Sequence, residues 1–299
     1  MLSDKFMSLS VRIDTSFIVP LLKYVTKPNN DLLLEITHHD AAKLTHAHAV
    51  RFGNTTKTAR EFWRDILRGL AKREDLIKQV KSSMVYLHNE SDTFNDLLKE
   101  LWNYFPEGTN QRTNLYGILG YDVGIVSEGN ALLNLGHSDF DKNPREILFM
   151  AMHELHHVVY TSYNTIFSVD DIHSISKLLD IIKYCTHMEG FAVYCTLEGR
   201  KAAGALNNRD YQLFLDDNAR KKRVSKFFDI LTDLEYRGSG PVHEKDFKIL
   251  NLMADKDRLW YVTGAHMAEV IDKSLGREML NETIRLGPDD FFNKYHESF

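Results

Sequence analysis

Residues 147–160, ILFMAMHELHHVVY, place three histidines and a glutamate within five positions of an otherwise apolar segment. Polar side chains that are buried in such a segment lose water, and this costs free energy unless another interaction replaces it. The segment has a defined start, since Asn143 offers an N-cap side chain, Pro144 suits the first helical position and Glu146 suits the third. We therefore predict a helix that continues through residue 163, and a binding role for its polar cluster.

His153, Glu154 and His157 match the pattern H-E-x-x-H. Residues four apart on a helix differ by about 40° in direction, so the two imidazoles point to one side and can bind one ion. Glu154 is rotated by about 100° from His153, within reach of a water molecule on that ion. Zinc suits such a donor set, and a catalytic zinc keeps one position for water. We predict one Zn²⁺ per chain, and we interpret His156 as a packing or supporting residue.

A third protein ligand is expected downstream, where residues 173–204 are typical of two helices broken near Cys185–His187. Glu189 is favoured, because Gly190 and Ala192 beside it permit the close helix approach that a buried ligand requires. The alternative for Glu189 is an exposed carboxylate in a first helical turn. The other candidates for the third ligand are His187, His173, Asp170 and Asp171.

The composition narrows the class of protein. The 299 residues are 43% hydrophobic and 26% charged, and the net charge of −5 argues against a whole-molecule attraction to nucleic acid or to an anionic membrane. No window approaches the roughly 18 continuous apolar residues of a spanning helix, and Asp4 and Lys5 stand where a signal peptide needs apolar residues. With only Cys185 and Cys195, no disulfide framework is expected. We predict a cytoplasmic protein without nucleic-acid or membrane partners, whose oligomeric state the sequence leaves open.

Long helical patterns dominate the chain, and we expect an α+β fold that is mostly α-helical. Apolar spacings of three and four predict helices over residues 11–25, 31–52, 58–87 and 92–105. Because residues 106–114 are rich in turn formers, we expect a helical N-terminal region, 1–110, and a catalytic domain, 111–299. Glu128-Gly129-Asn130 is typical of a turn between two short strands, so a small sheet or hairpin should precede the motif helix.

The string HELHH followed by MEGFAVY resembles the gluzincin metallopeptidases, whose zinc is held by the two motif histidines and a glutamate on a later helix. E-G-F-A is also similar to the N-E-G-F-A segment of the zinc aminopeptidases of that clan. The resemblance covers about residues 115–280 and implies a gluzincin-like catalytic domain with His153, His157 and Glu189 as zinc ligands. It implies Glu154 as the general base.

Two features depart from the aminopeptidases. Between His157 and Glu189 lie 31 residues, which is longer than those enzymes use, and no segment before the helix matches G-x-M-E-N. With a late Y-x-x-G, the whole pattern is closer to the poorly characterised predicted zinc-dependent protease families of the clan.

A peptidase also needs a hydrogen-bond donor for the oxyanion that develops during hydrolysis, which can be worth roughly 3–4 kcal/mol. We predict Tyr261 as this donor, with His266 as the second choice and Tyr194 as a further candidate. A core tyrosine bonded to a backbone carbonyl is an equally good interpretation of Tyr261. The small residues on its helical face allow tight packing; this face consists of Tyr261, Gly264, Ala268 and Ile271.

These features predict a zinc-dependent hydrolase, more specifically a peptidase that acts on peptide or protein substrates with Glu154 as the base. An extended peptide could pair with an edge strand in residues 120–136, although a hairpin that only covers the motif helix fits equally well. One alternative is a catalytically silent metal-binding or scaffold protein of the same fold. Another is a helical protein that binds nucleic acid or a partner and contains the motif by accident.

Three further features are interpreted without a function. The histidines at positions 38, 39, 46 and 48 have no acidic or sulfur partner in sequence except Asp40, which is typical of a solvated helix face. Residues 219–228, ARKKRVSKFF, are basic but are diluted by nearby aspartates, so we expect an exposed helix. Cys185 is interpreted as a small buried hydrophobe rather than a ligand.

Overall fold

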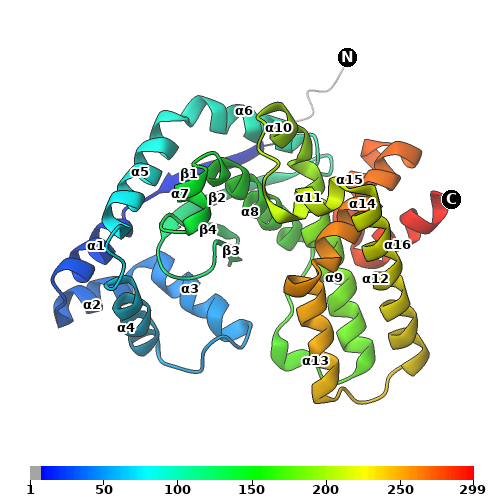
Figure 1. The fold of residues 1–299 in the computed structure, drawn as a ribbon, viewed down its shortest axis with the longest axis horizontal. Helices are drawn as coiled ribbons and strands as arrows, with labels where there is room; N and C mark the ends of the chain where they lie inside the picture. The colour runs from blue at the N-terminus through cyan, green and yellow to red at the C-terminus, as the bar shows by residue number, and fades with distance from the viewer. Residues whose placement is uncertain (1–7) are drawn as a thin grey trace. The chain divides into compact units, whose positions relative to one another are not determined.

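The computed structural model describes residues 8–299, which form sixteen α-helices, a 3-10 helix, a π-helix and one four-stranded sheet (Figure 1). The predicted class, a mostly helical α+β fold with a small sheet, is confirmed for this part of the chain. Asp4 and Lys5, on which the expectation of no signal peptide rests, lie outside the described residues. Within residues 8–299, no helix combines the length and the apolar character that crossing a membrane requires.

The sheet contains strands β1 (Ser8–Asp14), β2 (Asn110–Ile118), β3 (Gly124–Ser127) and β4 (Asn130–Asn134) in the order β1-β2-β4-β3. β1 and β4 both pair in parallel with β2, whereas β3 is antiparallel to β4 and forms one edge of the sheet. Glu128 and Gly129, which connect β3 to β4, both have positive φ, as the tight turns of hairpins require. The predicted turn between two short strands is therefore confirmed.

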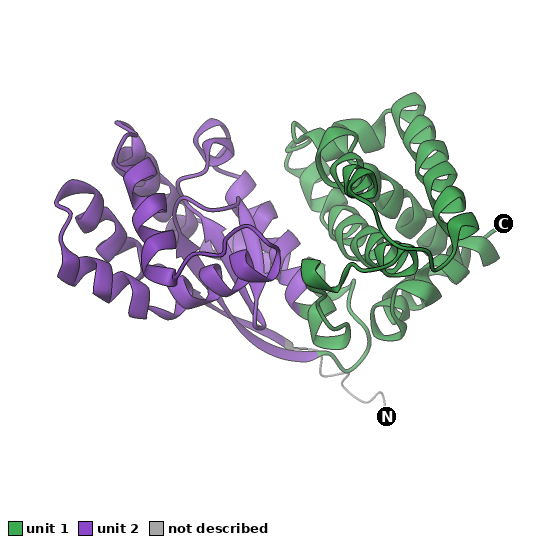
Figure 2. Cartoon of the chain, turned by 90° about the horizontal axis from the view of Figure 1, so that it is seen from below, with its two compact units in different colours: residues 1–6, 100–109, 159–299 green, residues 7–99, 110–158 purple. Residues whose placement is uncertain are grey.

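The described residues divide into two compact units (Figure 2). One unit contains residues 8–99 and 110–158 and combines the sheet with a set of helices. Within it, α3 packs against β2 and β3, and α2 packs against α1 and α4. Its helices are α1 (Ile18–Thr26), α2 (Asn30–His38), α3 (Asp40–Arg51), α4 (Ala59–Leu70), α5 (Leu76–Asn89), α7 (Ser138–Lys142) and most of α6 (Ser91–Trp102) and α8 (Glu146–Tyr163).

The other unit contains residues 100–109 and 159–299 and is helical. At its centre α9 (Ile175–Cys195) packs along α14 (Leu259–Leu275), and both contact α12 (Asp217–Arg237) and α16 (Pro288–Glu297) (Figure 1). The remaining elements are η1 (Val169–Asp171), α10 (Leu197–Ala202), α11 (Arg209–Leu215), α13 (Glu244–Asn251), the π-helix η2 (Leu252–Lys256) and α15 (Arg277–Leu286).

Several helix predictions in the N-terminal hundred residues are wrong in detail. Residues 11–14 belong to strand β1, whose partner β2 lies far along the chain, so local spacing could not reveal the pairing. The predicted helix 31–52 is interrupted at His39, whose extended backbone allows its ring nitrogen to accept a hydrogen bond from the Ala41 N–H and to cap α3. The predicted helix 58–87 is likewise interrupted between Leu70 and Leu76.

The histidine-rich helix face is less solvated than predicted. His48 forms ring contacts with Phe52 and Tyr121, at centroid distances of 4.6 and 5.8 Å, and its Nδ1 lies 3.3 Å from the Tyr121 hydroxyl. The basic segment 219–228 does lie on an exposed helix, where Lys221 and Lys222 face solvent. The prediction of a solvated face for the histidines missed the aromatic partner of His48, Tyr121, which is distant in sequence.

The C-terminal half differs from prediction at one helix. Residues 175–195 form the single uninterrupted helix α9, so the break predicted near Cys185–His187 is wrong. The second half of the turn-rich segment 106–114 begins strand β2. The division at residue 110 into a helical region and a catalytic domain is not tested by the compact units and stays a prediction.

Candidate metal centre

The helix α8, which carries the H-E-x-x-H pattern, begins close to the predicted point. The Asn143 side chain accepts a hydrogen bond from the Arg145 N–H, and the Glu146 N–H donates to the Asn143 carbonyl. This tight first turn means that the regular helix starts at Glu146, two residues later than predicted, and it then continues to Tyr163. Leu155 and Val159 are fully buried. The helix that carries the polar side chains is therefore largely buried.

The last turn of α8 is held against α9 by Tyr160. The Tyr160 hydroxyl lies 3.2 Å from Nδ1 of His187, and its ring packs edge-on against Tyr184 at 5.3 Å. His157 precedes Tyr160 by three residues on the same continuous helix. Glu189 is part of α9.

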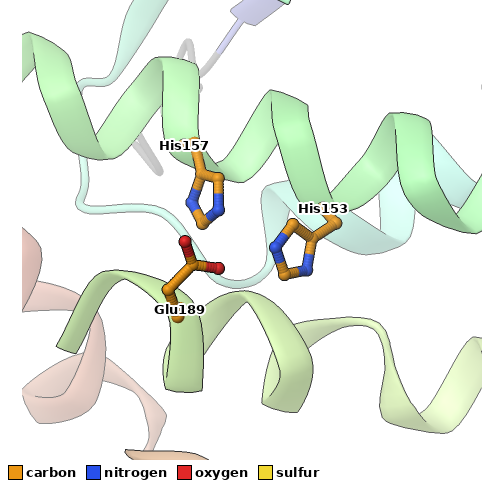
Figure 3. Close-up of side chains that lie close together, drawn as sticks. All are labelled: His153, His157 and Glu189. Carbon is orange, nitrogen blue, oxygen red and sulfur yellow. The ribbon is translucent and has the colours of Figure 1, made fainter. Parts of the chain in front are cut away.

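His153, His157 and Glu189 come together as predicted (Figure 3). Each side chain offers one ligand atom, and the three atoms lie within 4.8 Å of one another. The two imidazole rings, one turn apart on α8, have centroids 4.5 Å apart. His157 is buried, whereas His153 and Glu189 are partly buried.

This donor set fits zinc. Two imidazole nitrogens and one carboxylate oxygen are ligands that zinc accepts, at about 2.0–2.2 Å each, which in a tetrahedral site separates ligand atoms by about 3.4 Å. The observed upper limit of 4.8 Å exceeds this separation by an amount that small side-chain rotations can remove. Glu189 lies deep inside a long helix, so the alternative of a first-turn carboxylate is excluded.

Glu154 does not belong to the ligand set. The residue is 5% exposed, and its carboxylate lies against the start of β3, where a Cβ on Gly124 would be 2.5 Å from Oε1. Only glycine therefore leaves room for the carboxylate at this point. We did not predict Gly124 as a site residue, and the only signal was the glycine-rich character of residues 120–136.

The other candidates for the third ligand lie elsewhere. His187 is fully buried, its Nε2 lies 3.0 Å from Oγ1 of Thr283, and its ring stacks on Phe291. Burial lowers the pKa of His187 to about 3, as expected for a neutral core imidazole. The remaining candidates for the third ligand have exposed side chains and precede α9; they are Asp170, Asp171 and His173. Cys185 and His156 are buried, in agreement with their interpretation as packing residues.

Tyr261 lies on the helix that packs most closely against α9. This helix is α14. A Cβ on Gly190 of α9 would lie 2.2 Å from Cα of Gly264, so the tight packing predicted for the helical face of Tyr261 and Gly264 is confirmed. Tyr261 is partly buried against a hydrophobic cluster, and burial followed by the negative charge of Glu189 raises its pKa well above the usual value. The phenol therefore stays protonated, and the charge of Glu189 is part of its electrostatic environment.

His266 and Tyr194 have other surroundings. His266 is five residues beyond Tyr261, about 140° around the helix, and its ring lies 6.0 Å from that of Tyr295. Burial and the charge of Arg220 lower the pKa of His266. Tyr194 donates a hydrogen bond of 2.6 Å to Asp272. Of the three predicted donors, Tyr261 is the one on which the charge of Glu189 acts.

Arg258 and Asp210, which we did not predict as site residues, lie close to Tyr261. The guanidinium of Arg258 lies over the Tyr261 ring at 3.5 Å from its centroid, and it donates to both carboxylate oxygens of Asp210. No motif in the sequence marks either residue, because Asp210 and Arg258 are far apart in the chain.

A buried helix that presents two imidazoles one turn apart, with a carboxylate from a second helix, defines a protein with the side chains of a zinc site. The chain matches, over residues 26–299, the family described as "Putative zinc dependent peptidase (DUF5700)", and it belongs to this family. No curated protein and no solved structure matches the chain. The predicted membership in a zinc peptidase family is thereby confirmed.

Proposed function

We propose that this protein is a zinc-dependent hydrolase of the gluzincin type that cleaves peptide bonds, with one zinc ion per chain held by His153, His157 and Glu189. The observation that carries the proposal is the convergence of these three ligand atoms within 4.8 Å. A structural zinc site fills all four positions with protein ligands, whereas a catalytic site uses three and keeps one for water. Three protein ligands therefore favour an enzyme over a catalytically silent relative.

Glu154 is the proposed general base. A bound zinc ion lowers the pKa of water to about 7 and polarises a carbonyl group. Glu154 accepts the proton of the attacking water and passes it to the leaving amine. The absence of a side chain at Gly124 leaves the space in which the Glu154 carboxylate lies, and this supports a defined position for the base.

Tyr261 is the proposed donor to the oxyanion that develops on the scissile carbonyl group. A tyrosine hydroxyl is protonated at neutral pH, as a donor requires, and burial raises the pKa of Tyr261 further. The contact of Gly190 with Gly264 fixes the distance between the helices of Glu189 and Tyr261. His266 stays a weaker proposal, because the charges that act on its pKa come from Arg220, Glu269 and Lys273 and not from Glu189.

Peptide or protein chains are the proposed substrates, bound in extended form along β3. This strand has one partner, β4, and forms an edge of the sheet. Backbone hydrogen bonds to an edge strand accept many sequences. Because Gly124 lies against Glu154, a peptide paired with β3 would pass close to the base. A cytoplasmic location and the lack of nucleic-acid and membrane partners are further parts of this proposal.

Replacement of Glu154 by Gln tests the proposal. The variant should keep its zinc, measured by mass spectrometry of the metal, and lose hydrolysis of a mixed peptide library by a factor of roughly 10² or more. Glu146→Gln, the same substitution two turns earlier on α8, should keep both zinc and hydrolysis. Undiminished hydrolysis in Glu154→Gln contradicts the role of the base. A wild type that binds zinc but cleaves no peptide favours the silent alternative.

A further inference from the structure

Arg258, directly before α14, has an unusual backbone. Its φ of 55° and ψ of 38° place a residue other than glycine in the left-handed region, which such residues rarely adopt. It follows the π-helix η2, Leu252–Lys256, and single π-turns often occur at functional sites. Such conformations persist only where surrounding contacts hold them in place.

Arginine side chains hold residues 254–258 in place through hydrogen bonds to backbone carbonyls. Arg258 donates to the carbonyl of Ala254, and Arg209 donates to the carbonyls of both Asp255 and Lys256. At the next residue, Arg223 donates to the backbone carbonyl of Asp257, and Lys226 forms an ion pair with the Asp257 carboxylate at 2.6 Å. Four consecutive carbonyls at the end of the π-helix therefore have charged donors, and the position of Arg258 is closely determined.

The Arg258 side chain connects Asp210 to Tyr261. Nε and one terminal nitrogen donate to the two oxygens of Asp210, each at 2.6 Å, and the side chains are only 23% and 8% exposed. Paired donors of this kind fix the plane of a guanidinium. That plane lies over the Tyr261 ring at 3.5 Å, close enough for a cation–π contact. Asp210 therefore sets the orientation of Arg258, and Arg258 covers one face of the tyrosine ring.

We propose that Asp210 and Arg258 are positioning residues for Tyr261: the ion pair holds the guanidinium plane, and the guanidinium over the ring fixes the orientation of the tyrosine. The inference rests on the proposed function, in which Tyr261 is the oxyanion donor. A ring that rotates or tilts would misplace its hydroxyl, and misplacement by about 1 Å can cost a hundredfold in rate. The unusual backbone of Arg258 brings the guanidinium to this ring.

Arg258→Lys tests the inference, because lysine keeps the charge but cannot form the paired hydrogen bonds or the planar stack. The matched control is Arg277→Lys. Arg277 donates one hydrogen bond to Asp272 and lies over the ring of Tyr104 at 3.8 Å, so it also places a carboxylate-bound guanidinium over a tyrosine, one to which we assign no catalytic role.

The first readout needs no zinc and no activity. In zinc-free, full-length protein with ¹³C-labelled tyrosine rings, Tyr261→Phe identifies the signals of Tyr261 by their loss. Arg258→Lys should shift or broaden these signals and leave those of Tyr104 in place, whereas Arg277→Lys should do the reverse. Unmoved Tyr261 signals in Arg258→Lys overturn the inference. If Arg258→Lys does not fold, Asp210→Asn, which keeps the arginine, takes its place.

The second readout is a double-mutant cycle on the zinc-loaded enzyme. Arg258→Lys should lower kcat about tenfold to a hundredfold with little change in KM, and it should cause no further loss in a Tyr261→Phe background. An equal loss in both backgrounds means that Arg258 does not act through Tyr261. If the wild type hydrolyses no peptide, the proposed function fails, and the ring signals alone still decide whether Arg258 positions Tyr261.

Discussion

Gly190 of α9 and Gly264 of α14 meet backbone to backbone. A Cβ on Gly190 would lie 2.2 Å from Cα of Gly264, and a Cβ on Gly264 would lie 2.0 Å from the Thr186 carbonyl oxygen. Glu189 is next to the first glycine, and Tyr261 is one turn before the second. The packing of two core helices therefore sets the spacing between a proposed zinc ligand and a proposed oxyanion donor.

Gly264→Ala should lower the free energy of unfolding by about 1–3 kcal/mol, because the atoms in its way are backbone atoms that cannot rotate aside. Urea unfolding followed by circular dichroism measures this loss. Gly69→Ala is the control, since Gly69 lies in α4 with no heavy atom within 4 Å of an added Cβ. It should raise stability by about 0.5–1 kcal/mol. Equal stability of Gly264→Ala and wild type contradicts the contact.

Gly124→Ala should impair catalysis while the fold and the zinc are kept. The new methyl group would meet the Glu154 carboxylate at 2.5 Å, so the flexible side chain has to move away from its present position. We expect kcat to fall by roughly tenfold to a hundredfold, with metal content equal to that of the wild type. A variant with full activity shows that the position of Glu154 beside β3 has no part in the reaction.

Tyr261→Phe removes only a hydroxyl group and should lower kcat by roughly 10²–10³. His266→Gln should change kcat by less than about threefold, because His266 packs beside Tyr295 on another side of α14. Steady-state kinetics on one peptide substrate compare the two. The reverse order of effects identifies His266 as the donor and contradicts our assignment of Tyr261.

His48 should make the stability of the protein depend on pH. Burial, and to a smaller extent the charge of Arg51, lowers the pKa of His48 to about 4, compared with about 6.5 in an unfolded chain. Between these values the unfolded state binds the extra proton, so stability is complete above about pH 6.5 and falls as the pH drops toward 4.

Urea unfolding at pH 7.5 and pH 4.5 measures this effect. Between these two pH values, the free energy of unfolding should fall by about 2–3 kcal/mol less in His48→Gln than in the wild type. Glutamine is a suitable replacement because it can keep a polar contact with Tyr121 and does not titrate. Identical pH dependence in both proteins means that His48 is protonated as readily in the folded state as in the unfolded chain.

The sequence predicted the part of the site that depends on local geometry. His153 and His157 are one turn apart on a helix with a recognisable start, so their shared direction follows from helical spacing alone. Glu189 required two further signals, the small residues beside it and the resemblance to a known ligand segment. The predicted break in α9 was wrong, but Glu189 still lies beside the two histidines as predicted, because its choice depended on the neighbouring residues and not on the helix boundary.

The parts that the sequence did not predict depend on contacts between distant residues. Strand β1 pairs in parallel with β2 across six helices, so its short apolar pattern was taken for a helix. His48 was assigned to solvent because its partner Tyr121 is remote in the chain. The left-handed backbone of Arg258 has no sequence signal. The pairing of the Arg258 side chain with Asp210 follows only from the folded structure.

The central claim concerns the metal, and its content per chain is the most direct measurement. After dialysis to remove loosely bound ions, the wild type should contain about one zinc ion per chain, whereas His153→Ala and Glu189→Ala should each contain almost none. Glu146→Gln, on the same helix as the histidines, should keep the full amount. Circular dichroism establishes that each variant is folded. A folded Glu189→Ala protein that retains a full equivalent of zinc contradicts the ligand set on which this account rests.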